Sequence, residues 1–432
     1  MSQASKQSNL SWWQLSFIGV GCIIGTGYFL GSSIAIQKAG FAVLIAYLLS
    51  GIGTWIVYEA LAKMTANHPE KGSFRTYAKH AYGQWAGFSN GWMYWSAEML
   101  IMGSQLTAIA IFAQFWLPNI PIWIFAAVFA ILGLLIILLG VQKVEQMENM
   151  FGIMKLSAII MFIIVACFIL FSNQSESVFQ SSTQLSLPHG GIGLWVALLY
   201  AFYSFGGIEV MGLMAQELKD PKDAPKAGKF MIIALTLLYL LSIYLILKLT
   251  PISAINIDES PLLTTLGHFN ITWLIHFFNG MLIIAGFSTM VASLYGVTTM
   301  LVTLADEGDA PKFFARRGKL KVPLPAFILT STIVAVSIVI ALLLPDKIFE
   351  YITTAAGLML LYTWMFILFS FSKLLIKSVY DRIKVIFAFI LILAAVSGTL
   401  FDQISRIGFF VSIVFLIIIA VTTWIKQRKG IN

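Results

Sequence analysis

Cysteine and histidine are scarce in this chain. Among 432 residues there are only two cysteines, Cys22 and Cys167, both inside apolar segments, so a disulfide framework is excluded. The five histidines fall in or near expected loops, and no two have the helical spacing of a metal-ligand pair. No nucleophile stands at a credible spacing from a base. These absences predict a protein that is not an enzyme and holds neither metal nor cofactor.

Charge and long polar segments are also scarce. Charged residues make up 11% of the chain. The longest polar connection, around 172–191, has about 20 residues, which is too short for a soluble domain. We therefore expect the function to reside in the apolar segments.

The chain is rich in long apolar segments. Hydrophobic residues make up 59% of the sequence, in runs long enough to cross a hydrocarbon core of about 30 Å. These runs predict an all-α polytopic protein embedded in a lipid bilayer. Between the last two runs, the tight connection at 401–405 leaves a re-entrant pair as the alternative. The twelve expected spans are 14–36, 41–62, 83–116, 121–140, 149–172, 191–217, 229–250, 271–305, 325–344, 348–372, 384–401 and 405–425.

The basic residues lie on one side of this expected topology. With both termini in the cytoplasm, all but five of the 27 Lys and Arg residues fall in cytoplasmic loops and tails, as the positive-inside bias predicts. The bias accounts for the net charge of +8 without a nucleic-acid partner. The short loops and tails indicate a bacterial-type cell membrane. The five exceptions are Lys38, Lys155, Lys248, Lys347 and Arg406.

Glycine interrupts two of the apolar spans at membrane depth. Five glycines occur within residues 19–31, and Gly206 and Gly207 interrupt the sixth span. An irregular backbone survives there only where protein or a water-filled cavity satisfies its polar groups. Paired interruptions of this kind are typical of transporters built from repeats. We therefore expect a substrate cavity at the two breaks; the alternative is that the glycines only allow close helix packing.

Five short motifs stand out along the chain, at 24–31, 69–74, 91–95, 206–209 and 217–227. The first reads Ile-Gly-Thr-Gly-Tyr-Phe-Leu-Gly, and the fourth reads Gly-Gly-Ile-Glu. In this order and spacing they resemble the amino acid/polyamine/organocation (APC) superfamily of permeases, in its amino acid transporter branch. The resemblance covers nearly the whole chain.

The resemblance implies the leucine-transporter fold, which has two inverted repeats of five helices each. The first repeat corresponds to 14–172 and the second to 191–372, and each begins with one of the broken spans. Residues 1–13 are then a cytoplasmic tail. Residues 373–432 hold two extra helices and the C-terminal tail, outside the transport core.

The resemblance also implies where an amino acid binds. A half-helix that begins in mid-membrane presents unpaired amides and a positive dipole end, which suit a carboxylate. Carbonyls that end the preceding half-helix suit the ammonium group. Tyr203 matches an aromatic that closes over the substrate, so we expect it to be a gate, with simple packing as the alternative. The expected substrate-binding set is Ile23, Gly25, Thr26, Gly27, Glu98, Tyr203, Ser204, Phe205 and Gly206.

Few ionisable groups lie at membrane depth, where each is costly. Lys155 resembles a family lysine whose ammonium replaces a sodium ion, which implies a role in coupling to H⁺ or in organising the site; snorkelling to the cytoplasmic interface is the alternative. We expect Glu209 to be a structural carboxylate rather than a titrating one, and Glu59 to be structural as well.

Glu98 is where the chain departs from the family pattern. The family's acidic residue commonly stands where this chain has Gln105, seven residues further along and on the same helix face. Glu98 is expected to exchange the driving proton, to pair with a cationic substrate, or to be a buried carboxylate without transport function.

These observations predict a secondary active amino acid transporter that takes up neutral or apolar substrates with H⁺. An exchanger, a carrier of cationic amino acids or amines, and a permease-like nutrient sensor remain alternatives. An ion channel is disfavoured, because a continuous polar pore lining is missing from the sequence. The sequence leaves the oligomeric state open.

Overall fold

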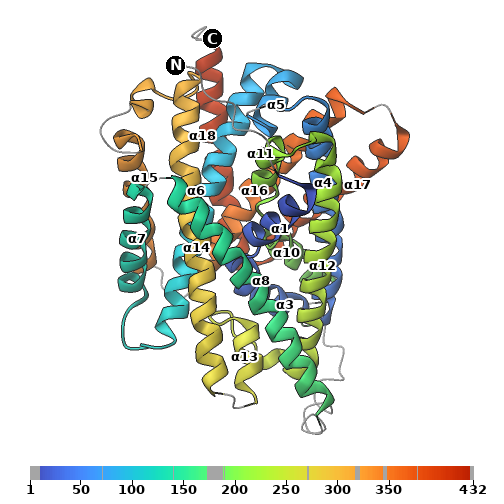
Figure 1. Ribbon diagram of the computed structural model, residues 1–432, viewed down its shortest axis with the longest axis vertical. Helices are drawn as coiled ribbons and strands as arrows, with labels where there is room; N and C mark the ends of the chain where they lie inside the picture. The colour runs from blue at the N-terminus through green and yellow to red at the C-terminus, as the bar shows by residue number, and fades with distance from the viewer. Residues whose placement is uncertain are drawn as a thin grey trace.

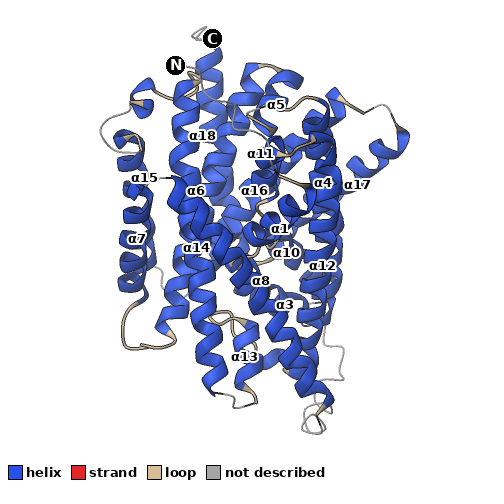
Figure 2. Cartoon of the chain, viewed as in Figure 1, coloured by secondary structure: helices blue, strands red, loops and turns tan. Residues whose placement is uncertain are grey.

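Helices make up nearly all of the described chain, as the apolar runs predict (Figures 1 and 2). The computed structural model describes residues 10–428 except 71, 140, 173–187, 189, 270–271, 317–321, 344–347 and 377, and the side chains of 141–149 and 216 are outside this description. Lys71, Lys347, His189 and most of the expected tail 1–13 therefore lie outside the described residues. The two termini lie at the same end of the bundle.

About twelve spans account for the described part of the bundle. Eleven helical segments of the described chain are long and apolar enough to cross a membrane, and one of them, Thr26–Asn67, holds the second half of the first expected span together with the whole second span. The expected fold class is thus confirmed. The helices are α1 Trp12–Ile23, α2 Thr26–Phe29, α3 Gly31–Ala39, α4 Val43–Asn67, α6 Gln84–Gln114, α7 Ile122–Leu139, α8 Val141–Phe171, α10 Gly190–Tyr203, α11 Ile208–Met214, α12 Ala224–Leu249, α14 Thr272–Asp306, α15 Leu324–Leu343, α16 Ile348–Leu374, α17 Val379–Gly398 and α18 Gln403–Arg428.

Burial separates central helices from peripheral ones. The most apolar windows of α6 and α16 are 83% and 78% buried, whereas those of α7, α15 and α18 are 22% buried. An apolar helix surface that no other part of the protein covers is suited to contact with lipid. The centre of the bundle is therefore built around α6 and α16, with α7, α15 and α18 toward the membrane.

The two broken spans lie against each other in opposite directions. α10, the half before the second break, packs on α2 and α3, the part after the first break. α11, the half after the second break, packs on α1, the half before the first break. This pairing brings the two breaks together in the centre of the bundle.

Two short helices have no counterpart among the expected spans. α5 (Phe74–Tyr82) and α13 (Pro261–Gly267) fall in segments that the sequence places in connections, because each is too short to span a membrane. α5 is held by Arg75, whose buried guanidinium pairs with Glu307 at 2.5 Å and with Asp309. These ion pairs join α5 to the end of α14, on the side of the bundle where the termini lie.

Candidate functional site

The first break is two residues long and separates α1 from α2. Ile24 and Gly25 are both extended, and Gly25 has φ −155° and ψ −165°. Helical hydrogen bonding resumes when the carbonyl of Gly25 accepts from Tyr28 and Phe29, each at 3.1 Å. The amides of the first residues of α2 therefore have no acceptor within the helix. The last carbonyls of α1 likewise have no donor within the helix.

The second break spans residues 204–207, between α10 and α11. Two tight turns lead into it, in which the amides of Phe205 and Gly206 donate to Phe202 at 2.9 Å and to Tyr203 at 3.0 Å. Gly207 ends it in the left-handed region, with φ +114°. Only glycine adopts this region without a steric penalty, so this glycine fixes the position at which α11 begins.

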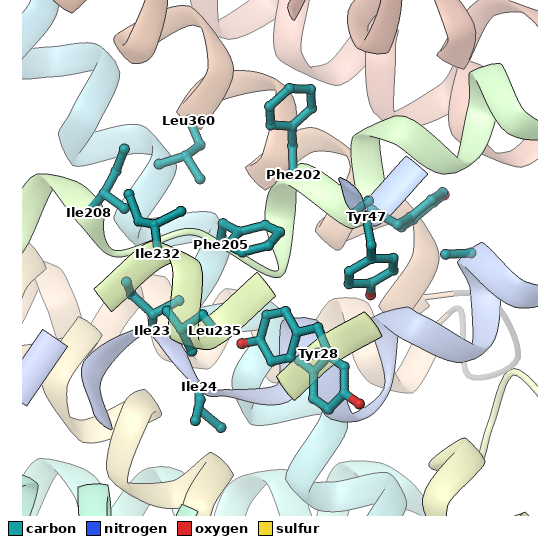
Figure 3. Close-up of a cluster of buried hydrophobic side chains, with 14 of the residues drawn as sticks. Ile23, Ile24, Tyr28, Tyr47, Phe202, Phe205, Ile208, Ile232, Leu235 and Leu360 are labelled. Carbon is teal, nitrogen blue, oxygen red and sulfur yellow. The ribbon is translucent and has the colours of Figure 1, made fainter. Parts of the chain in front are cut away.

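Hydrogen bonds and close packing join the two breaks. The Ser204 hydroxyl donates to the carbonyl of Gly27 at 3.0 Å and also contacts the Tyr47 hydroxyl at 2.9 Å. A Cβ on Gly207 would lie 3.3 Å from the Ile23 side chain. Figure 3 shows Ile23 and Ile24 near Phe205 and Ile208, with Tyr28 and Tyr47 beside them. The residues predicted around both breaks thus come together.

Gln105 and Thr289 complete the surroundings of Thr26. The Thr26 hydroxyl donates to Gln105 Oε1 at 3.0 Å, and the Thr289 hydroxyl donates to the same oxygen. All three side chains are buried. Gln105 comes from α6 and Thr289 from α14, so the start of α2 is tied to two continuous helices. The sequence pointed to the Gln105 position but held no signal for Thr289.

Tyr203 is the last residue of α10 and covers Gly27. A Cβ on Gly27 would lie 3.0 Å from two ring carbons of Tyr203. The Tyr203 hydroxyl is buried without a hydrogen-bond partner among the described residues. Ser104 of α6 lies beside this hydroxyl. Its role as a gate remains a prediction.

Glu209 holds the second break through both carboxylate oxygens. Oε2 accepts from the Gly207 amide at 3.0 Å, and Oε1 accepts from the indole N–H of Trp364 on α16. The side chain is fully buried. A carboxylate at the start of α11 also complements the positive end of that half-helix. This geometry favours the structural role expected for Glu209.

Glu98 lies inside the bundle, two turns before Gln105 on α6. It is 8% exposed, and its Oε2 lies 3.7 Å from the position that a Cβ on Gly296 of α14 would take. It is within electrostatic range of Glu209 and Tyr203. The hydrogen bond to Thr26, however, belongs to Gln105. Glu98 is therefore a carboxylate near the second break, and its contact with substrate remains a prediction.

Lys155 of α8 is buried against the end of α1. Its side chain is 1% exposed, and Nζ donates to the Gly21 carbonyl at 3.2 Å. In an unbroken helix that carbonyl would accept from the amide of Gly25. The ammonium thus replaces a hydrogen bond lost at the break and complements the negative end of α1. This burial favours a role in organising the break over snorkelling to the interface, and the role of Lys155 remains a prediction.

An ion-pair cluster ties the broken spans together at the end opposite the termini. Lys38 of α3 lies 2.7 Å from Asp402 and 3.2 Å from Glu350 of α16, and Tyr200 of α10 donates to Glu350 at 3.2 Å. Burial alone would raise the pKa of Asp402, but hydrogen bonds from Lys38 and from the Ser405 amide outweigh it and hold that pKa below its usual value.

Backbone contacts tie the same spans at the end that bears the termini. Leu10, just before α1, pairs with the segment after α11: its amide donates to Glu217 at 3.1 Å, and its carbonyl accepts from Lys219 at 2.9 Å. The Ser16 hydroxyl donates to the carbonyl of Ala227 at 2.8 Å. Both ends of the first broken span are therefore held by contacts that an opening motion would have to break.

Gln105→Leu is expected to reduce the kcat/KM of substrate uptake by about 10-fold or more. The change removes the acceptor shared by two buried hydroxyls, and an unsatisfied buried group costs about 1–3 kcal/mol. The measurement is initial uptake rate against substrate concentration in proteoliposomes. Gln403→Leu, at an exposed position of α18, is the matched control. Equal kcat/KM in the two variants would contradict a role for Gln105 in the site.

The chain is similar to known permeases along almost its entire length. Residues 14–431 match the amino acid permease family. The chain is 53% identical to the uncharacterized transporter YcgH of Bacillus subtilis (strain 168), over 99% of this chain and 98% of that protein. It is 31% identical to the aromatic amino acid transport protein AroP of Escherichia coli (strain K12), over 83% of this chain and 80% of AroP. The resemblance inferred from the motifs is confirmed: this multi-pass membrane protein belongs to the amino acid permease family.

Proposed function

We propose that this chain is a secondary active transporter that takes up neutral or apolar amino acids across the cell membrane together with H⁺. The observation that carries the proposal is the pair of adjacent breaks, joined by the hydrogen bond from Ser204 to Gly27. The amides that begin α2, which have no acceptor within the helix, suit the substrate carboxylate, and the carbonyls that end α1 suit its ammonium group. Alternating access would then proceed by movement of the broken spans against α6 and α14, within the two proposed repeats, 14–172 and 191–372.

The surroundings of the breaks support an apolar substrate. The side chains beside the breaks include the apolar Ile23 and Leu360 and the ring of Tyr203, and the hydrogen-bonding residue of α6 is the neutral Gln105. A neutral amide at this position offers no charge to pair with a basic side chain. The similarity to AroP, an aromatic amino acid transport protein by name, places aromatic amino acids first among the substrates to test.

Buried ionisable groups support coupling to H⁺. Glu98 and Glu209 lie within electrostatic range of each other, and Lys155 caps the half-helix before the first break. Protons are carried through membrane proteins by groups of this kind. We assign Glu209 mainly to holding the break, which leaves Glu98 and Lys155 as the groups to test for coupling. Both termini are proposed to be cytoplasmic, in accord with the positive-inside bias.

Uptake by proteoliposomes tests the proposal. Radiolabelled aromatic, branched-chain, small neutral and basic amino acids are offered with an inward pH gradient, without one, and with the gradient collapsed by a protonophore. We expect gradient-stimulated accumulation of aromatic or branched-chain substrates. Uptake that requires a preloaded amino acid would indicate an exchanger. Accumulation of basic amino acids alone would show that the substrate is cationic, and saturable binding without flux would indicate a sensor.

A further inference from the structure

A cavity lies beside α13. Helix α13 is at the end of the bundle opposite the termini (Figure 1). We call this space the α13 cavity; its volume is about 390 Å³. It is bounded by the end of α6, the starts of α7 and α14, and the segment that leads into α13. Its lining includes Phe112, Phe115, Asp258, Glu259, Leu263 and Asn279.

The polar groups of the α13 cavity are mostly hydrogen-bond acceptors. Asp258 and Glu259 are adjacent on its wall, and no described residue that lines it is basic. Glu259 has no ion-pair partner among the described residues; its Oε2 accepts from the Thr264 hydroxyl at 3.2 Å. Burial raises the pKa of the Glu259 carboxyl, as expected for an acid without a nearby cation. A cation would therefore find carboxylate acceptors here, on a wall whose described lining residues include no basic one.

Asn279 adds a buried acceptor that the fold leaves unused. Its side chain is 0% exposed, and its Nδ2 donates to the carbonyl of Phe112 at 2.8 Å. Its Oδ1 is buried without a hydrogen-bond partner among the described residues. An orphaned buried amide oxygen costs free energy, which a donor supplied by a ligand would recover.

Apart from Asn279, the two acids and the side-chain amides of Gln114 and Asn256, the wall of the α13 cavity is apolar. Phe112, Phe115 and Leu263 form part of it. A small inorganic cation would gain nothing from these side chains and would need a denser set of oxygen ligands. A primary ammonium group attached to an apolar body fits better, because its three donors can meet the acceptors while the body lies against the aromatic wall.

The α13 cavity and the central site share two helices. The hydrogen bond from Asn279 to Phe112 joins α14 to α6 at the cavity, and the contact between Gln105 and Thr289 joins the same helices at the first break. At 1.5 Å per residue, the two links are about 10 to 15 Å apart along these helices. The cavity and the first break are therefore only about two to three helical turns apart along α6 and α14.

We infer that the α13 cavity is a second binding site, which takes a protonated primary amine attached to an apolar body. The identity of its natural ligand rests on the proposed function: it is the amino acid to be transported, held by its ammonium group with its carboxylate toward the open side. An amine without a carboxylate binds the same acceptors. The site would raise the local concentration of substrate before the substrate reaches the breaks.

Equilibrium binding of radiolabelled phenethylamine to the purified full chain in nanodiscs tests this site without any need for transport. Phenylalanine should compete with the amine, and N-acetylphenylalanine, which lacks the ammonium group, should not. Glu259→Gln and Asp258→Asn should each weaken amine binding by about 10-fold, since each removes a charged acceptor. Asp306→Asn, an exposed acid at the other end of α14, is the control and should bind normally.

A variant in the central site separates the two sites. Gly207→Ala, which is expected to disable the breaks, should keep amine binding. If amine binding is lost in Gly207→Ala and kept in Glu259→Gln, the amine occupies the breaks and the inference is overturned. Absence of saturable amine binding to the intact chain also overturns it. In either case gradient-driven uptake would still be measurable, so the proposed function is judged independently.

Discussion

Replacing Gly207 with alanine is expected to lower the rate of amino acid uptake at least 10-fold while the chain still folds. The residue has φ +114°, and a non-glycine residue held in so sparsely populated a region costs about 1–3 kcal/mol. The added Cβ would also press on Ile23, 3.3 Å away across the two breaks. The backbone can relieve the strain only by shifting the start of α11, which would displace the Gly207 amide from Glu209 and the second break from the first.

Initial uptake rates in proteoliposomes, normalised to the amount of reconstituted protein, measure this effect. Size-exclusion chromatography checks that the variant remains folded. Gly31→Ala is the matched control, since it lies in the same family motif as Gly25 and Gly27 but a Cβ there meets no atom within 4 Å. Alanine also favours helix by about 1 kcal/mol over glycine. If Gly207→Ala transports as fast as Gly31→Ala, the geometry of the second break is not required for transport.

The glycines of the first span show how far sequence reasoning reaches. Glycine at membrane depth correctly predicted a break, and the break is at Gly25. The alternative of close helix packing also holds, but at other positions. A Cβ on Gly21 would lie 2.7 Å from the Cα of Gly152, and one on Gly27 would meet the ring of Tyr203. Composition alone could not assign each glycine to a break or to a close helix contact, because both roles require a residue without a side chain.

Hydrogen-bond partners on distant helices could not be predicted from the sequence. Trp364 binds Glu209 and Thr289 binds Gln105, yet neither residue belongs to a motif or has unusual spacing. Such pairs depend on how α14 and α16 are rotated about their axes. In a helix that is apolar on every side, no polar face marks that rotation. Lys155 was easier to identify, because a charged side chain in an apolar span costs free energy and therefore calls for a functional or structural reason.

Lys155→Met is expected to reduce uptake at least 10-fold and to remove its stimulation by a pH gradient. The change deletes the ammonium that donates to the Gly21 carbonyl and leaves this buried acceptor at the end of α1 without its charged partner. A hydrogen bond to a charged group contributes about 1.5–3 kcal/mol. Lys155→Arg keeps a charged donor and should retain part of the uptake. Lys373→Met, which removes a lysine near a helix end, should leave uptake unchanged.

Gly152→Ala tests the same contact without touching the charge. Gly152 and Lys155 are three residues apart and share a face of α8, and the close approach of Gly152 to Gly21 is what brings Nζ within reach of the carbonyl. A Cβ would force the backbones of α8 and α1 apart and lengthen the hydrogen bond. If the ammonium acts by capping α1, Gly152→Ala should lose uptake as Lys155→Met does. If Gly152→Ala keeps full, gradient-stimulated uptake and only Lys155→Met loses it, the charge acts in coupling independently of this cap.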